Sequence, residues 1–314
     1  MQLRPLGTTG LTVSTVGLGC NNFGLRIDSA TSKTVIHKAL DLGITFFDTA
    51  DVYGHRGGSE TCLGQFLGTR RKDIVIASKF GSPMDEAGTL KGATRQYILS
   101  AVEASLKRLN TDWIDIYQLH RYDTATPLAE TMGALDDLIK QGKIRHAGVS
   151  ALPAWRLMDM QWTARHHGYR TLSTCEVEYS LLARAPEREL IPAMQSTGMA
   201  LLPYYPLASG FLTGKYQRNM PKPEGARITK GKRYEEMFMT DANWTRLEGF
   251  EAFSKARGHT VLELAFSWLA AQPIVGCVIA GATRPEQLEA NVKAADWTLT
   301  PDELAEIDRI TNMA

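Results

Sequence analysis

The stretch YILSAVEASLKRLNTDWIDIYQLH, from Tyr97 to His120, contains a structural unit that recurs along the chain. Its first half has apolar side chains at helical spacing, namely Tyr97, Ile98, Ala101, Val102, Leu106 and Leu109. Asn110 follows, and asparagine tolerates the left-handed backbone conformation that ends many helices. The second half, from Trp113, is a short run rich in apolar residues, as in a buried strand. The stretch therefore predicts a helix followed by a strand.

Runs of this second kind occur eight times. They begin at Thr15, Thr45, Asp73, Trp113, Ile144, Leu172, Met199 and Val275. Helical stretches lie between most of them, and a glycine separates helix from strand at Gly43, Gly142, Gly168 and Gly198. Strands that alternate with helices and are apolar on both faces are most simply parallel. Eight such units predict an α/β fold, a (β/α)8 TIM barrel.

An open, doubly wound sheet is the alternative fold. It is less favoured, because Gly17 and Gly19 are followed by Asn22 and not by the third glycine of the dinucleotide-binding fingerprint. We therefore interpret residues 1–314 as a single barrel domain. The interval between the last two strands holds a long loop insertion after strand 7, from about Ala208 to Asp241, which we expect to act as a lid or clamp. Residues 2 to 13 are expected to form a hairpin that closes the barrel floor.

The composition excludes several classes of function. The chain has 44% hydrophobic and 22% charged residues and a net charge of +1, so no excess charge is present to bind nucleic acid or an anionic membrane. It shows no secretory leader pattern and no run of eighteen apolar residues, which predicts a cytoplasmic protein without a membrane partner. The four cysteines are far apart and are expected to be reduced thiols. We predict no metal site, since His166 and His167 have no candidate partners.

Polar residues follow the predicted strands at the end where barrel enzymes build their active sites. Asp48 and Tyr53 follow the second strand, Lys79 ends the third, and His120 ends the fourth. An ammonium stabilises a phenolate, so Lys79 is expected to move the pKa of Tyr53 toward the working range and make it a general acid. Asp48 can hold the ammonium, and His120 can donate a hydrogen bond to a carbonyl oxygen. Such a site protonates an oxygen, and a reduction there requires a hydride from a cofactor.

Several ordered motifs resemble the aldo-keto reductase superfamily. They are R-P-L-G-x-T-G-L-x-V-S from Arg4 to Ser14, F-D-T-A-x-x-Y-G from Phe47 to Gly54, Q-L-H from Gln118 to His120, G-V-S from Gly148 to Ser150, E-Y-S-L-L from Glu178 to Leu182, P-L-x-x-G-x-L-T-G-K from Pro206 to Lys215 and G-A-T-R-P-E-Q-L-E-A-N from Gly281 to Asn291. The resemblance covers nearly the whole chain. It implies a (β/α)8 barrel that reduces aldehydes and ketones reversibly with NAD(P)H and without a metal.

The resemblance also implies roles for individual residues. Tyr53 becomes the general acid, Lys79 and Asp48 its tuning pair, and His120 the donor that orients the carbonyl group. The implied cofactor-binding residues are Ser150, Glu176, Tyr204, Leu207, Gly210, Lys215, Gly281, Thr283, Arg284, Gln287 and Asn291. Tyr204 would stack on the nicotinamide ring. An arginine fork beside a hydroxyl suits a 2′-phosphate, so Arg284 and Thr283 favour NADPH (NADP+) over NADH.

The substrate is expected to be a small-molecule carbonyl compound, whose pocket Asn22, Phe23 and Tyr122 would line together with Tyr53. The sequence does not specify which aldehyde or ketone this is. It also leaves the oligomeric state and the direction of the reaction in the cell open.

Four residues depart from the family pattern. Ala151 stands where the family commonly has asparagine, Glu176 where it has glutamine, Ala280 where it has proline, and Tyr205 where it often has serine. Both amides that would hold the carboxamide of the nicotinamide are therefore missing. One alternative function is an NADPH-binding regulatory subunit with little or no turnover. Another is a hydrolase with two carboxylates, since Glu176 and Glu178 share one face of a strand.

Overall fold

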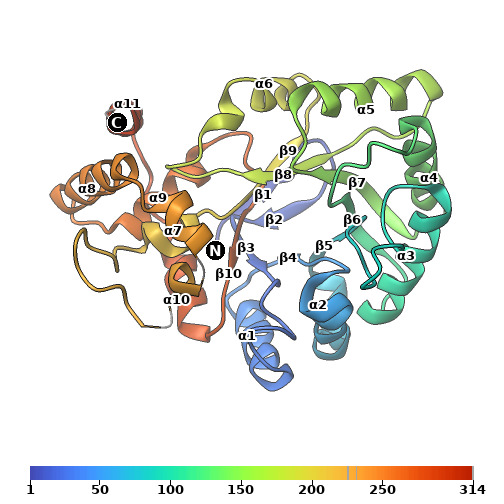
Figure 1. Ribbon diagram of the computed structural model, residues 1–314, viewed down its shortest axis with the longest axis horizontal. Helices are drawn as coiled ribbons and strands as arrows, with labels where there is room; N and C mark the ends of the chain where they lie inside the picture. Colours follow the sequence, from blue (N-terminus) through green and yellow to red (C-terminus); the bar gives the residue numbers. More distant parts are fainter. Residues whose placement is uncertain (225, 231, 313–314) are drawn as a thin grey trace.

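The computed structural model describes residues 1–224, 226–230 and 232–312 of the chain. Within these residues, eight strands form one parallel sheet in the order β10-β3-β4-β5-β6-β7-β8-β9. The strands are β3 (Val16–Gly19), β4 (Phe46–Asp48), β5 (Val75–Phe80), β6 (Ile114–Leu119), β7 (Ile144–Ser150), β8 (Thr174–Glu178), β9 (Ala200–Tyr204) and β10 (Val278–Gly281). Figure 1 shows them at the centre of the molecule, with the helices around them.

The sheet closes on itself between β9 and β10. Leu201 forms a parallel bridge with Val275, just before β10. The Leu201 backbone N–H donates to the Ile274 carbonyl at 2.8 Å, and its carbonyl accepts from the Gly276 N–H at 2.9 Å. These bonds complete the ring, and the predicted (β/α)8 TIM barrel is confirmed.

The helices that cover the barrel follow the predicted alternation. They are α1 (Ser29–Asp41), α2 (Tyr53–Phe66), α3 (Arg95–Leu109), α4 (Leu128–Lys140), α5 (Ala154–His167), α6 (Leu190–Gln195), α9 (Val261–Ala271) and α10 (Pro285–Ala294), with α8 (Asp241–Ala256) and α11 (Pro301–Thr311) added outside. Gly43, Gly142, Gly168 and Gly198 have φ values between +70° and +77°, and Asn110 has φ +50°. Each follows a helix and turns the chain toward the next strand, as predicted.

The barrel floor is closed by the predicted hairpin. Strands β1 (Leu3–Pro5) and β2 (Thr12–Ser14) pair antiparallel. Leu6 and Val13 pack into the barrel interior against residues such as Phe46, Ile116 and Leu202. A second, larger apolar cluster lies between the strands and the outer helices. The hairpin therefore fills the bottom of the barrel and leaves its carboxyl-terminal mouth open for a site.

The insertion after β9 folds into short helical segments. These are η3 (Ala208–Thr213), η4 (Arg227–Lys230) and α7 (Lys232–Phe238). Residues 225 and 231 of the predicted insertion, and residues 313 and 314 of the predicted domain, lie outside the described residues. All four cysteines are buried and free of disulfides. Of the helices in the described ranges, none is long and apolar enough to cross a membrane.

Candidate active site

A cavity of about 1420 Å³ opens at the carboxyl ends of the barrel strands. Residues from the ends of six strands line it, namely Gly19, Asp48, Ser150, Glu176, Glu178, Tyr204, Ile279 and Gly281, together with His120 directly after β6. The insertion after β9 supplies much of the remaining wall, including Ser209, Gly210 and Lys215. The polar residues that the sequence places at separate strand ends therefore meet in one cavity.

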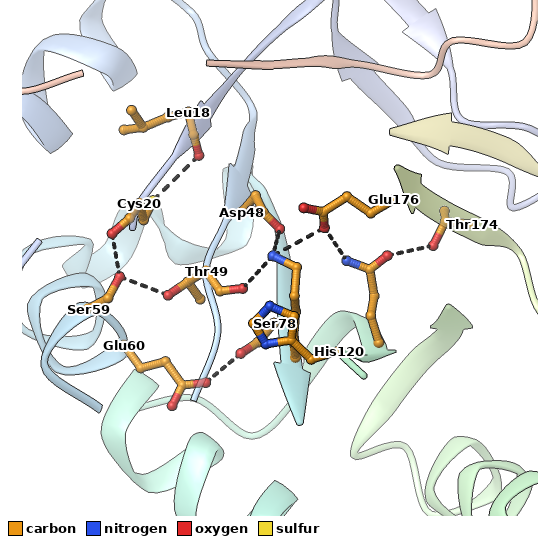
Figure 2. A network of polar contacts seen from close by, with 12 residues as sticks. Leu18, Cys20, Asp48, Thr49, Ser59, Glu60, Ser78, His120, Thr174 and Glu176 are labelled. Atoms are coloured by element: carbon orange, nitrogen blue, oxygen red, sulfur yellow. Dashed lines mark hydrogen bonds and ion pairs between the residues drawn. The ribbon is translucent and has the colours of Figure 1, made fainter. Parts of the chain in front are cut away.

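At the bottom of this cavity, one buried ammonium contacts two carboxyl groups. The Lys79 side chain has no exposed surface; its Nζ lies 2.6 Å from Asp48 Oδ1 and 3.1 Å from Glu176 Oε2. Nζ also donates to the Thr49 carbonyl at 3.1 Å. In Figure 2, dashed lines run from Asp48, Thr49 and Glu176 to one nitrogen atom between them, and the contacts of these three residues identify that atom as Lys79 Nζ. The parallel register places these groups together. Asp48 on β4 pairs with Ala77 on β5, and Glu176 on β8 pairs with Ser150 at the end of β7.

Burial changes the acidity of this cluster. It raises the pKa of Asp48 to about 8, with the nearby Glu176 carboxyl adding to the rise and Lys79 opposing it. The pKa of Lys79 lies well above its usual value, since the attraction of Asp48 and Glu176 outweighs the cost of burial. The lysine is therefore held as a cation, and the carboxyl groups compete for it.

Tyr53 is held above Lys79 by an unusual backbone. The four residues that follow it, Gly54, His55, Arg56 and Gly57, all have φ between +57° and +121°, before α2 continues as a regular helix. A Cβ at Gly54 would lie 2.4 Å from the Phe23 carbonyl oxygen, so only glycine fits there. Left-handed non-glycine residues are costly, and this strain fixes where the Tyr53 ring stands.

The electrostatic tuning of Tyr53 differs from the prediction. Lys79 Nζ lies 5.1 Å from the centroid of the Tyr53 ring and lowers the pKa of the phenol, as expected. Burial raises that pKa by more, so its net shift is upward. The predicted net lowering is wrong for this state of the protein, because the sequence does not reveal how completely the hydroxyl is removed from water. The phenol is therefore fully protonated at neutral pH.

His120 stands beside Tyr53. The two ring centroids are 5.6 Å apart in an edge-to-face arrangement. Burial first, then the positive charges of Lys79 and Arg121, lower the pKa of His120 to about 3. Its Nδ1 lies 3.3 Å from the Ser82 hydroxyl. The imidazole is neutral at physiological pH and can present one N–H toward the cavity.

The residues predicted to bind the cofactor all line the same cavity. Lys215 and Arg284 lie close enough that Arg284, after burial, lowers the pKa of Lys215. Neither cation forms an ion pair with a carboxylate of the described residues. The side chain of Gln287 is only partly available to bind a cofactor. Its amide oxygen accepts from the Thr283 and Arg284 backbone N–H groups and caps α10. Only its amide nitrogen remains to meet a ligand.

At the predicted nicotinamide end, the carboxyl group of Glu176 is likewise already bound by other side chains of the protein. Besides Lys79, its Oε2 accepts from Gln118 Nε2 at 3.0 Å, and Gln118 is oriented by the Thr174 hydroxyl at 3.2 Å. Its neighbour Ser150 is buried at the end of β7. Ala151 follows with φ +53°, a conformation that asparagine adopts more readily than alanine. The substitution of asparagine by alanine therefore leaves strain as well as a missing amide.

The predicted substrate residues separate into two groups. Asn22 and Tyr122 line the cavity, and the Asn22 Oδ1 has no hydrogen-bond partner in the described part of the chain. Phe23 does not line it; its side chain is fully buried in the apolar cluster beneath the outer helices. The prediction for Phe23 fails because the chain turns between Asn22 and Ile27, which directs the ring into the core.

Sequence reasoning missed several residues that contribute to the site. Gln118 belongs to the Q-L-H motif, but its role in holding Glu176 depends on the three-dimensional register of the strands. The Ser209 hydroxyl is buried in the cavity wall and has no hydrogen-bond partner in the described ranges. The remaining missed lining residues include Arg26, Arg121, Arg227 and Tyr234. No signal in the sequence identifies them, because they come from loops and the insertion. Among the described residues, no cluster of three His, Cys, Asp or Glu side chains could hold a metal ion.

Comparison with known proteins agrees with this geometry. A family model described as the Aldo/keto reductase family matches residues 15–312. The chain is 33% identical to an uncharacterised oxidoreductase of Bacillus subtilis, over 99% of this chain and 96% of that protein. It is 34% identical to a probable voltage-gated potassium channel subunit beta of Arabidopsis thaliana, with the same coverage. It is also 34% identical to the L-glyceraldehyde 3-phosphate reductase of Escherichia coli O157:H7, over 98% of this chain and 92% of that protein.

Proposed function

The chain belongs to the aldo/keto reductase family, and we propose that it reduces aldehydes or ketones to alcohols with NADPH, using Tyr53 as the general acid. The observation that carries the proposal is the meeting of Tyr53, His120 and the buried Lys79–Asp48 pair at the bottom of one cavity. This combination provides a proton donor, a hydrogen-bond donor for the carbonyl oxygen and a fixed positive charge.

The cavity fits a dinucleotide. Its volume of about 1420 Å³ exceeds that of the pockets that hold drug-sized ligands, roughly 300–1,000 Å³. The unpartnered Ser209 hydroxyl lies in the wall next to Gly210, where a Cβ would lie only 3.3 Å from Lys215 Nζ. In this proposal, Leu207, Gly210 and Lys215 bind the diphosphate, and Tyr204 and Ser150 bind the nicotinamide. Gly281, Thr283, Arg284, Gln287 and Asn291 bind the adenosine end.

When bound, the nicotinamide cofactor would supply the hydride for the carbonyl carbon. Tyr53 donates its hydroxyl proton to the carbonyl oxygen as charge develops there, and Lys79 stabilises the phenolate that remains. Asp48 holds Lys79 in place. A neutral His120 whose Nδ1 accepts from Ser82 carries its proton on Nε2 and can donate it to the same oxygen. The low pKa of His120 keeps the imidazole in this form across the physiological range.

The charges at the outer end of the cavity favour NADPH over NADH. Lys215 and Arg284 both line the cavity and repel each other, and neither forms an ion pair with a carboxylate in the described part of the chain. A phosphate group of the cofactor would neutralise them, and the guanidinium of Arg284 matches the geometry of a 2′-phosphate.

Replacing Tyr53 by phenylalanine tests the proposed acid. We expect Tyr53→Phe to lower kcat/KM for a neutral test aldehyde by about 10²- to 10⁴-fold, because the ring keeps its packing but has no proton to give. The dissociation constant for NADPH, measured by fluorescence titration, should change less than about twofold. Tyr169→Phe, at a half-buried tyrosine outside the cavity, is the matched control and should keep both values. A Tyr53→Phe protein with unchanged kcat/KM would refute the role.

A second candidate function is an NADPH-binding regulatory subunit with little turnover. Relatives named as potassium channel beta subunits favour it, with 34% and 32% identity for the Arabidopsis thaliana and Oryza sativa proteins. The two candidates differ in one measurement. A protein that binds NADPH tightly but oxidises none of it across a panel of aldehydes and ketones supports the regulatory function, whereas saturable aldehyde-dependent oxidation supports the reductase.

A further inference from the structure

Glu176 brings a second carboxyl group into contact with the ammonium of Lys79, which already contacts Asp48. The side chains of Lys79, Asp48 and Glu176 are 0%, 5% and 4% exposed, so the three groups share a volume that water barely reaches. Where the family has a neutral glutamine, this chain therefore adds a titratable group within 3.1 Å of the lysine.

No second cation compensates for it. Among the described residues, neither Asp48 nor Glu176 forms an ion pair with any group other than Lys79. Their other neighbours are Gln118, which donates to Glu176, and the backbone carbonyl of Thr49, which accepts from Lys79. The remaining titratable groups that interact electrostatically with this cluster include Tyr53, Asp51, His120, Cys20, Tyr204, Cys175 and Cys277. Burial raises the pKa of Asp51 to about 8 as well, and His120 is neutral at physiological pH because burial lowers its pKa to about 3. Glu178 acts on Tyr204, whose pKa it helps to raise after the larger effect of burial. None of them supplies a positive charge.

With both carboxyl groups ionised, this cluster would carry a net charge of −1 in a nearly dry site. Two neighbouring carboxylates in such a site share a proton, because like charges at close range raise the cost of ionising the second. The pKa of Asp48, raised to about 8 by burial and by Glu176, agrees with this. In the resting protein the Asp48/Glu176 pair then carries one negative charge, which Lys79 balances.

We propose that the Asp48/Glu176 pair is a proton reservoir behind Tyr53, loaded with one proton when the nicotinamide is reduced and empty when it is oxidised. Glu176 acts in this scheme as a positioning residue, through Lys79. The inference rests on the proposed function, since it concerns the charge of the nicotinamide ring. A reduced ring is neutral and an oxidised ring is a cation, so the total charge of ring, lysine and carboxyl pair stays at zero in both states.

The proton balance follows from the contacts. The Tyr53 O–H bond breaks, and its proton forms the O–H bond of the alcohol. Lys79 returns an Nζ proton to the phenolate, and the protonated carboxyl group gives its proton to Nζ. Tyr53 and Lys79 are then restored, both carboxylates are ionised, and solvent reloads the pair after the products leave.

Binding without turnover tests this scheme. We would titrate the protein with NADP+ and with NADPH by calorimetry at pH 7, in phosphate and in Tris, whose ionisation enthalpies differ. Wild-type protein should release up to about one proton more with NADP+ than with NADPH, because the cationic ring favours the ionised pair. Comparing the two cofactors cancels any ionisation of their shared phosphates. Glu176→Gln should abolish the difference, since the remaining carboxylate is already ionised and matched by Lys79.

Glu178→Gln is the matched control, because Glu178 lines the same cavity from the same strand but does not contact Lys79. It should keep the proton release. Retained release in Glu176→Gln, loss of release only in Glu178→Gln, or no release in wild type would each overturn the reservoir. Asp48→Asn should also abolish the release, and it serves if Glu176→Gln does not fold. A protein that binds neither cofactor would refute the proposed function itself.

The pH dependence gives an independent readout. Between pH 6 and 8, the ratio of the NADPH to the NADP+ dissociation constant should rise with pH in wild type, by at most about tenfold per pH unit. The sign follows because higher pH favours the ionised pair, which favours the cationic ring. A flat ratio in wild type, or an unchanged slope in Glu176→Gln, contradicts the scheme.

Discussion

The two ends of the cavity hold their charges in opposite ways. At the bottom, Lys79 is fully buried and bound to two carboxyl groups of the chain. At the outer end, Lys215 and Arg284 repel each other and have no carboxylate partner in the described residues, and Arg284 is exposed. The cation at the inner end is therefore paired within the chain, whereas the two cations at the outer end are not.

This difference separates two kinds of energetic effect. Changes at the inner end alter proton affinities and folding stability, because the charges there are desolvated and mutually dependent. We expect changes at the outer end to alter the affinity for an anionic ligand in a salt-dependent way, because those charges are exposed to the ions in solution. Three substitutions test the comparison, each at a different place along the cavity.

Removing the buried ammonium should have the largest effect. Lys79→Met leaves Asp48 and Glu176 together in a dry site with no cation, so both must be protonated for the protein to stay folded. We expect the free energy of unfolding at pH 7 to fall by about 3–5 kcal/mol, the usual cost of breaking a buried ion pair. Urea unfolding measures it, with Lys72→Met, at an exposed lysine, as control.

The same unfolding experiment at lower pH tests how the stability deficit of Lys79→Met changes with pH. A carboxyl group whose pKa is raised in the folded state binds more protons there than in the unfolded state, so its penalty shrinks as pH falls. The deficit of Lys79→Met should therefore be smaller at pH 5 than at pH 7. A deficit that stays constant with pH would mean that lost packing, and not unpaired charge, destabilises the variant.

At the outer end, Arg284→Gln should weaken NADPH binding by about 10- to 100-fold and leave NADH binding nearly unchanged, because only NADPH carries the 2′-phosphate. Fluorescence titration gives both constants. Lys293→Gln, on the same helix α10 but outside the cavity, should affect neither. An equal loss of affinity for NADPH and NADH would mean that Arg284 contacts a group that both cofactors carry, and not the 2′-phosphate.

The smallest expected effect on stability concerns Ala151, which lines the cavity directly after β7. Its φ of +53° is unfavourable for alanine and better tolerated by asparagine. Ala151→Asn should raise the free energy of unfolding by about 0.5–1 kcal/mol, measured by urea unfolding. Ala125→Asn, at an exposed alanine without a positive φ, should show no gain. A loss of stability at position 151 would show that the added amide clashes with the site.

The barrel could be predicted because its signals are local. Apolar strands such as Ile114–Leu119, and left-handed residues such as Asn110 after α3, depend on short stretches of chain. Residues at strand ends could be assigned to one cavity for the same reason, since parallel strands end at one rim. The positions of Asp48, Lys79 and His120 follow from this rule.

Side-chain direction in the loops and the balance of charges could not be predicted. Phe23 lies one residue from Asn22, yet it enters the core while Asn22 lines the cavity, because a turn specific to this loop sets the direction. Glu176 was expected to face the cofactor, and its contact with Lys79 depends on the register between three strands. The upward pKa of Tyr53 depends on burial, which is a property of the whole fold.

The left-handed residues that follow Tyr53 limit which substitutions laboratory evolution can use in this turn without moving the tyrosine. Gly54 and Gly57 must stay glycine, because a Cβ would lie 2.4 Å from the Phe23 carbonyl oxygen at the first position and because φ is +121° at the second. His55 and Arg56 between them are exposed, so their side chains are free to vary while their backbone is not. A library at positions 55 and 56 should therefore be restricted to glycine, asparagine and aspartate alongside the present residues. We expect β-branched residues there to displace the tyrosine, because they are the least able to adopt the left-handed backbone.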